Sequence, residues 1–385
     1  MSVQVRLYEA DEALRRVSWP DSAYGRYARA YLTPLLAHGS AHYVRNVRTR
    51  LLVAEVDGIP LPLTVNEAEY DNAYVCSPYT HYIRYARQEL HAYVNRPLAA
   101  VLSPVLGGVG ALLRLSGFDR VVQVNNWLLS TNLYPRLSLR QHAALLDVLR
   151  QTMPKHAIVC RSLTAALNPD AIRAVRDSGG LLVPSRQVYL LRTDREPLAD
   201  AKARWLLKRD GALAAAHGYE PAGPGELTAA DIPRIVELYE LLYLDKYSHC
   251  NPAFTPAMIA AALQDGILEL HGYRREGRLD AVLGFYERNS VMTTPLFGYD
   301  TQLPRELGLY RMLSERLIRL AQARGCLLHE SSGAAQFKRN RGAVAELEYT
   351  GLCAAHLPLG RRLGWRALER LLGGIGVPLL RKYKL

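Results

Sequence analysis

The chain has 385 residues, of which 49% are hydrophobic and 22% charged, and its formal net charge at pH 7 is +12. This length predicts two domains, and the apolar fraction is ordinary for a globular protein with sizeable cores. The positive charge favours an anionic ligand or partner, such as coenzyme A phosphates, an acidic carrier protein, tRNA or an anionic membrane, without choosing among them.

Cysteine usage and hydropathy predict a cytoplasmic protein. The five cysteines are scattered without C-x-x-C spacing, which argues for a reducing compartment and against a disulfide framework or a zinc knuckle. The apolar stretch 98–115 contains Ser, Pro, three Gly and Arg114, so it is too broken to predict a membrane span. The N-terminus has early acidic residues and no signal-peptide core.

The first 85 residues predict a helix, a hairpin and a polar aromatic segment. Residues 1–50 read as helical and basic, and strands 51–56 and 59–65 form a hairpin around the turn Asp57-Gly58. The segment 66–85 is dense in Tyr, Asn and His, which suits a surface that lines a ligand. A half-buried rim of sheet and helix explains the same composition equally well.

Strands and helices alternate in the next hundred residues, which predicts a sheet with crossover helices. The expected elements are a strand at 120–125, a helix at 139–153 capped by Ser138, a strand at 157–160, a helix from Asn168-Pro169, and a hairpin of 181–183 with 187–191.

The middle of the chain predicts a linker and then a second set of elements. The linker at 194–225 includes a charged helix at 200–209, and a further helix covers 230–247. A loop with Tyr247 and Asn251 follows, and Thr255-Pro256 opens another helix. The next predicted elements are a hairpin of 267–274 with 281–287 around Gly277.

Residues 293–358 predict the strand–helix–strand unit around which the rest is arranged. An apolar run at 293–300 is followed by a helix at 307–325, whose apolar residues recur at helical spacing. A second apolar run at 326–333 and a third at 348–358 complete the unit. The helix begins at Leu307-Gly308-Leu309, where bare N–H groups and the positive dipole end suit a phosphate. Alternatively, Gly308 simply begins the helix and binds no ligand.

The motifs of this unit resemble a known superfamily. Gly-Tyr-Asp at 298–300, Gly-Leu-Tyr-Arg at 308–311, Ser-Gly-Ala at 332–334 and Phe-Lys-x-x-Arg-Gly at 337–342 resemble the GNAT acyltransferases. More narrowly they resemble a two-domain branch related to the Fem-type aminoacyl transferases, and the match is best over 233–358. The usual Gln/Arg-x-x-Gly-x-Gly/Ala turn is absent, and Gln302–Gly308 stands in its place.

The resemblance implies an α/β fold of the mixed α+β kind, with two GNAT-like halves that each have a mixed central sheet flanked by helices. The expected domains are a degenerate N-terminal half at 1–193, the linker at 194–225, and a C-terminal half at 226–385. The last of these would carry the acyl-donor site and a basic C-terminal helix. The first half lacks a glycine turn after its strand and therefore reads as a partner without its own active site.

The implied chemistry is direct attack of an amine on an acyl thioester. Such attack needs a base for the amine proton and a fixed donor for the oxyanion. The chain has no G-x-S-x-G elbow and no evident Cys–His pair, so no covalent intermediate is expected. Glu330 and His329 are the candidate bases. Each residue also has a purely structural explanation: Glu330 would form a salt bridge with Lys338 or Arg341, and His329 would be a buried, hydrogen-bonded core residue.

Two groups of residues are the candidates for binding. On the donor side, Lys338 and Arg341 are three residues apart and could together hold an anion. The candidate donor-binding residues are Tyr299, Leu307, Gly308, Leu309, Tyr310, Lys338 and Arg341. The acceptor side, where basic residues would hold a carboxylate, comprises Tyr247, Asn251, Asn126, Arg161 and Arg186. No metal site is expected, because the histidines are dispersed.

Three functions follow as alternatives. The first is an N-acyltransferase that uses acyl-CoA or an acyl carrier protein as co-substrate, holds no permanent cofactor, and acylates the amine of a small, carboxylate-bearing metabolite. The second is a Fem-like transferase that depends on aminoacyl-tRNA, which the charge permits and no RNA-binding motif supports. The third is a non-catalytic binding protein with the same fold. The basic, amphipathic tail from Arg361 to Lys384 would rest on a membrane, dock an acidic carrier, or simply cover the sheet.

Overall fold

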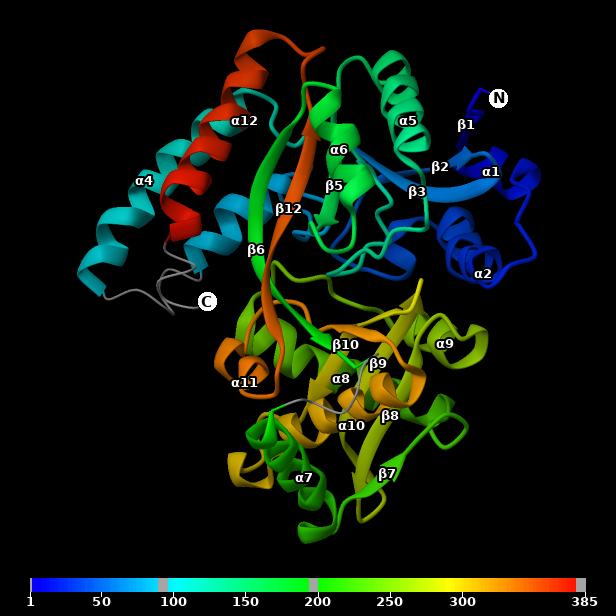
Figure 1. The fold of residues 1–385 in the computed structure, drawn as a ribbon, viewed down its shortest axis with the longest axis vertical. Helices are drawn as coiled ribbons and strands as arrows, with labels where there is room; N and C mark the ends of the chain where they lie inside the picture. Colours follow the sequence, from blue (N-terminus) through cyan, green and yellow to red (C-terminus); the bar gives the residue numbers. More distant parts are fainter. Residues whose placement is uncertain (1, 89–95, 194–199, 379–385) are drawn as a thin grey trace. The chain divides into compact units, whose positions relative to one another are not determined.

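The computed structural model of the chain describes residues 2–88, 96–193 and 200–378, which form two compact units (Figure 1). Unit 1 comprises the described residues of Met1–Ser185, Ser248–Ala253 and Glu348–Lys382, and unit 2 those of Arg186–Tyr247 and Phe254–Leu347. Each unit therefore contains a piece of chain from the opposite half of the sequence.

The sheet of unit 1 is mixed. Its strands are β1 (Val5–Glu9), β2 (Arg50–Val56), β3 (Ile59–Asn66), β4 (Val121–Val124), β5 (Ala157–Leu163) and the unit 1 part of β12 (Val344–Cys353), in that spatial order. Neighbours are antiparallel except β4 and β5, which are parallel. The last strand is unusual because β12 comes from the far end of the chain and pairs with β5 through Leu352 and Val159.

Helices cover both faces of this sheet, as the alternation of its side chains requires. Val122 and Ile158 face a core with α5 (Leu139–Thr152) and α6 (Pro169–Asp177). Val121 and Val159 face a core with α4 (Arg96–Leu115) and α12 (Leu359–Leu371). The other helical segments of unit 1 are α1 (Ala10–Arg16), α2 (Ala23–His38), the single turn η1 (Ser40–His42), and the π-helices η2 (Thr80–Tyr85) and η6 (Leu372–Gly376).

Unit 2 repeats the same pattern of pairing. Its strands, in spatial order, are β7 (Glu220–Ala222), β8 (Glu269–Arg275), β9 (Arg278–Arg288), β10 (Val291–Tyr299), β11 (Leu327–His329) and the unit 2 part of β6 (Leu181–Arg192). Only β10 and β11 are parallel. Here too the last strand comes from the opposite half of the sequence, because β6 pairs with β11 through Leu191 and Leu328.

The helices of unit 2 also cover both faces of its sheet. Phe297 packs on Tyr310 of α10 (Leu309–Arg324), while the next residue of β10, Gly298, lies against Leu238 of α8 (Ile232–Glu240). Helix α7 (Ala201–Ala216) packs beside α10. The remaining segments are η3 (Ala229–Asp231), the π-helix η4 (Leu241–Tyr247), α9 (Pro256–Asp265), η5 (Arg305–Leu307) and α11 (Ala335–Arg339).

The predicted fold class, a mixed sheet flanked by helices in each half, is confirmed. Two predicted elements are wrong. Residues 1–50 include strand β1 beside their helices, and 181–191 is not a hairpin but one continuous strand, β6. The expected turn between 183 and 187 contains Pro184, but a proline is tolerated in a strand wherever its missing N–H has no ladder bond to make.

The chain is also divided differently from the predicted domain ranges. Helix α7 lies inside the predicted linker, yet Ala203 and Leu207 belong to the core of unit 2. Residues from Glu348 onward, predicted to belong to the C-terminal half, lie with unit 1 as far as they are described. Arg381, Lys382 and Lys384 of the predicted basic tail are outside the described residues.

Candidate functional site

The parallel strands of unit 2 separate at their carboxyl ends. Pairing between β10 and β11 runs over three residues and stops at Thr293 and His329. The register of β10 with β9 shifts just after Thr293, at a segment that contains Pro295, which has no N–H to donate. The chain after His329 instead follows β6, since the Glu330 N–H donates to the Tyr189 carbonyl over 2.9 Å. Sheets of this kind place ligands beyond the carboxyl ends of such strands.

Glu330 is the first residue beyond the end of β11, and its carboxylate is only partly satisfied. The Oε2 atom is buried and has no hydrogen-bond partner within the described part of the chain. Burial raises the pKa of Glu330, and the positive charges of Lys338 and Arg341 offset part of that rise. A buried carboxylate with a free acceptor and a raised pKa is suited to accept a proton near neutral pH.

Lys338 holds the loop that follows Glu330. Its side chain is buried, and Nζ donates to the carbonyl oxygens of Glu330 over 2.5 Å and Ser332 over 2.9 Å. Burial lowers the pKa of Lys338, while the Glu330 charge raises it. The ammonium therefore fixes the backbone at the end of β11 and places a positive charge next to the carboxylate.

Three aromatic rings contact one another next to Glu330, whose charge acts on Tyr310. The ring of Tyr310 lies 4.9 Å from that of Phe337 and 6.3 Å from that of Tyr299, between ring centres. Burial raises the pKa of Tyr310, and the nearby Glu330 charge raises it further. We call Tyr299, Tyr310, Glu330, Phe337 and Lys338 the strand-end cluster.

Arg341 belongs to a buried ionic group rather than to an open anion site. Its Nε donates to Oδ2 of Asp210 over 2.9 Å, and Arg311 Nε donates to Oδ1 of the same carboxylate over 2.7 Å. Asp210 is fully buried. This group fastens α7 to α10 and to the turn after α11, so a bound anion would have to share Arg341 with Asp210.

Asp210 was missed by the sequence reasoning. A signal for it exists, because Asp210 lies on the same face of α7 as the buried residues Ala203, Leu206 and Leu207. A carboxylate at an apolar helix position needs a cationic partner. The sequence does not say which of many arginines supplies it.

The start of α10 is packed more closely than a phosphate cradle requires. Gly308 has φ +73°, and a Cβ atom there would lie 2.7 Å from Leu213 Cδ1 of α7. Its carbonyl accepts the N–H groups of Arg311 and Met312, which leaves those of Leu309 and Tyr310 outside the helix's own hydrogen bonds. Helix packing thus explains Gly308, and phosphate binding at Leu307–Tyr310 stays a prediction.

His329 differs from Glu330 in its surroundings. Its ring is buried, and Nδ1 accepts the N–H of Ser331 over 3.2 Å. The structure thus places the two candidate bases side by side in sequence but gives only Glu330 a buried oxygen without a partner among the described residues.

The predicted acceptor residues fall in both units. In unit 1, Asn126 and Arg161 come together, since Arg161 Nη1 donates to the Val75 carbonyl over 3.0 Å and lies 3.5 Å from Asn126 Oδ1. Asn251 is buried, and its amide donates to the Ser248 carbonyl. In unit 2, Tyr247 is exposed, and the charge of Arg186 acts on Lys338. Their role as an acceptor site stays a prediction.

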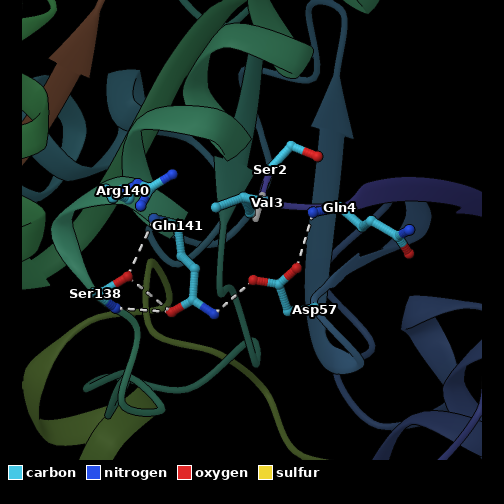
Figure 2. Close-up of a pocket in the computed structure, with 7 residues that line it drawn as sticks. All are labelled: Ser2, Val3, Gln4, Asp57, Ser138, Arg140 and Gln141. Carbon is cyan, nitrogen blue, oxygen red and sulfur yellow. Dashed lines mark hydrogen bonds between the residues drawn. The ribbon is translucent and has the colours of Figure 1, made fainter.

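A surface hollow of about 720 Å³ lies in unit 1 (Figure 2). Its polar groups are bonded to one another: Asp57 accepts the Gln4 N–H over 2.8 Å and the Gln141 amide over 2.9 Å, and Ser138 caps the helix that starts beside it. Satisfied side chains of this kind offer little to a ligand, and we place the candidate site at the strand-end cluster.

The described residues show neither a metal-ligand cluster nor a membrane-spanning helix. Within 2–88, 96–193 and 200–378, no group of three or more His, Cys, Asp or Glu side chains is placed to hold a metal ion. Over the same residues, none of the helices combines the length and the apolarity that crossing a bilayer requires.

Comparison with known proteins gives structural likenesses only. No family model and no curated protein sequence matches the chain. L-PGS from Bacillus licheniformis is similar with 13% identity and a TM-score of 0.45, over 60% of this chain and 78% of that one. FemX is similar with 11% identity and a TM-score of 0.43, over 55% and 76%.

A GNAT-family acetyltransferase from Novosphingobium aromaticivorans is similar with 17% identity and a TM-score of 0.29, over 45% of this chain and 64% of that one. At such low identity and overlap, the function is inferred from the residues of the chain itself.

Proposed function

We propose that the chain is a GNAT-like N-acyltransferase whose reaction takes place at the strand-end cluster of unit 2. The observation that carries the proposal is the Glu330 carboxylate, which lies where β10 and β11 separate and keeps one buried oxygen without a partner among the described residues. A buried acceptor in that position suits a base for an attacking amine.

The proposed step is direct transfer. The lone pair of the acceptor amine attacks the thioester carbonyl, the C–N bond forms, and the C–S bond breaks. Glu330 takes the proton that the amine loses, and the thiolate leaves and is protonated to the free thiol. The proton that Glu330 has accepted then passes to the thiolate, which restores the carboxylate; burial raises the pKa of Tyr310, so its hydroxyl is the weaker acid of the two.

The proposed donor is an acyl-CoA or an acyl carrier protein, and the proposed acceptor is the amine of a small, carboxylate-bearing metabolite. The net charge of +12 favours both polyanionic donors. Leu307–Tyr310 and Tyr299 are the proposed donor contacts. The acyl chain would lie along the unpaired edge of β10, where backbone groups are available to hold an extended segment.

The test combines binding and turnover with the full chain. Coenzyme A, acetyl-CoA and a long-chain acyl-CoA are expected to raise the thermal unfolding midpoint, because a ligand that binds only the native state stabilises it. Thiol release that depends on an added amino acid or amine is then expected from the wild type and strongly reduced in Glu330→Gln. Binding without any acceptor-dependent thiol release would contradict the proposal.

A Fem-like transferase that takes its acyl group from aminoacyl-tRNA is the second candidate, because the same charge favours RNA. Stabilisation by tRNA and not by coenzyme A, with binding that weakens steeply as salt rises, would favour this alternative. Stabilisation by neither ligand would leave delivery by a carrier protein, or a binding protein without catalysis.

A further inference from the structure

Exposed leucines gather on two helices of unit 1. Nine large hydrophobic side chains are exposed among the described residues, and five of them lie on α4 and α12. They are Leu112 (69% exposed), Leu115 (86%), Leu359 (57%), Leu363 (51%) and Leu371 (40%). Scattered exposed leucines are normal, but a concentration of this kind marks an interaction surface.

These leucines are not the core faces of their helices. Helix α12 turns Trp365 and Leu368 inward, and the Trp365 ring stacks on Phe118 at 3.9 Å. Leu113 of α4 belongs to the same core, and a Cβ atom on Gly364 of α12 would lie 3.2 Å from it, so the two helices lie side by side (Figure 1). The inner faces of both helices are therefore already packed in the core of unit 1, and the exposed leucines lie outside that core.

The outer face of α4 is apolar. At helical spacing it carries Pro104, Gly108, Ala111, Leu112 and Leu115, all of them exposed, and the exposed Arg114 lies at its border. The outer face of α12 alternates apolar and basic side chains: Leu359, Leu363 and Leu371 share it with Arg366 and Arg370, which are also exposed. We call these two outer faces the α4/α12 face.

The charge of this part of the chain is almost wholly positive. Within the described ranges 96–115 and 359–378, the sequence has six arginines, no lysine and one acidic residue, Glu369. A second copy of the chain would bring like charges together in a symmetric contact, which disfavours self-association. Exposed leucines interleaved with arginines are instead the composition of a helix that lies in the plane of an anionic membrane.

We propose that the α4/α12 face docks unit 1 on an anionic lipid bilayer, with the leucines entering the headgroup boundary and the arginines contacting lipid phosphates. Neither helix crosses the bilayer, in keeping with the search of the described helices. The attachment is peripheral and reversible, because two short apolar faces bury too little area for permanent insertion. This inference is independent of the proposed acyl transfer.

The test is flotation of the full chain with two kinds of vesicle, one of phosphatidylcholine alone and one that also contains 30 mol% phosphatidylglycerol. We expect binding to the anionic vesicles only, weakened by salt. Arg366→Glu with Arg370→Glu should weaken it about tenfold or more, since each basic residue near the surface contributes on that order. Leu112→Ser with Leu115→Ser should weaken it as well and leave the residual binding more sensitive to salt.

Matched control variants test whether a loss of binding is specific to the α4/α12 face or follows from any change in net charge or exposed apolar area. Arg15→Glu with Arg176→Glu makes the same change of net charge at exposed positions of other helices, and Val344→Ser removes an exposed apolar side chain from unit 2. Both should bind like the wild type. Equal loss in the control and test variants would overturn the proposal, as would failure of the wild type to bind anionic vesicles. Capture of acyl carrier protein by this face, with no vesicle binding, would replace it with a protein partner.

Discussion

At the scale of single residues, the buried charges of unit 2 differ in how fully their hydrogen-bonding groups are satisfied. Asp210 is neutralised by two arginines, and the Lys338 ammonium is bonded to carbonyl oxygens. Glu330 alone among these groups keeps a buried acceptor without a partner in the described chain. The sequence offered Glu330 and His329, both within the apolar run 326–333, as candidate bases. It could not predict Asp210 as the partner of Arg341, because that pairing spans 131 residues and depends on how α7 packs.

Replacing Glu330 by Gln should lower the rate of acyl transfer by about a hundredfold or more, because a positioned base contributes on that order. Burial raises the pKa of Glu330, so the wild-type rate should climb with pH at higher values than an ordinary glutamate would give. The variant should lose this rising limb of the profile. The matched control is Glu346→Gln, a half-exposed residue on β12, whose pH–rate profile should match the wild type.

Asp119 in unit 1 should make stability fall as pH rises. Burial raises its pKa to about 7 from 3.8, although Ser77 and the Tyr79 N–H donate to it. Between these values the folded state holds a proton that the unfolded chain has released, so the unfolding free energy declines by an amount on the order of a few kcal/mol. Asp119→Asn should flatten that decline in urea unfolding at several pH values.

A control of opposite sign is Asp57→Asn. Hydrogen bonds from Gln4 and Gln141 lower the pKa of Asp57, so its contribution is present above its ordinary pKa and lost as pH falls. If Asp119→Asn left the wild-type slope unchanged between pH 4 and 7, Asp119 would not be the buried acid that the structure shows.

At the scale of elements, local patterns predicted most helices and strands, and tertiary packing decided the rest. The capped helix α5, the hairpin of β2 and β3, and α10 lie where the spacing of their apolar residues placed them. Strand β1 was missed because a short, half-exposed strand has no apolar run. The π-helix η4 was missed because its hydrogen-bond shift leaves no mark in the pattern of residues.

Gly298 shows how tightly one of these elements must fit. A Cβ atom at this position would lie 2.6 Å from the backbone of Leu238 in α8. Gly298→Ala should therefore cost about 3 kcal/mol of unfolding free energy, since backbone cannot move aside as a flexible side chain can. Gly360→Ala, in the first turn of α12 with nothing within 4 Å, should be neutral or slightly stabilising in the same urea unfolding experiment.

At the scale of the whole molecule, the feature that no local pattern could predict is that each unit takes its last strand from the opposite half of the sequence. Each half of the sequence was expected to complete its own sheet, because neighbours in sequence usually pair. Instead β12 pairs with β5 of unit 1, and β6 pairs with β11 of unit 2. The similar order of elements in the two halves was predicted, and it holds, but the last pairing within each unit joins residues far apart in the chain.

Residues 1–193 and 194–385, produced separately, should therefore both fail to fold. The first piece lacks β12 together with Trp365 and Leu368 of its core, and the second lacks the β6 residues that pair with β11. Produced together, the two pieces should associate and recover native circular dichroism and sharp amide resonances. A well-dispersed spectrum from either piece alone would show that its sheet does not need the strand from the opposite half of the sequence.

The last strand of unit 1 also sets the order of events while the protein is being made. Strand β5 is finished by residue 163 and pairs with β4 on one side, but the partner of its other edge, β12, begins only at Val344. The nascent chain therefore carries an open strand edge until nearly the whole message has been translated. Unpaired edges of this kind invite association with other chains. We therefore expect the ribosome-bound intermediate, and not the finished protein, to be the species that most needs a chaperone.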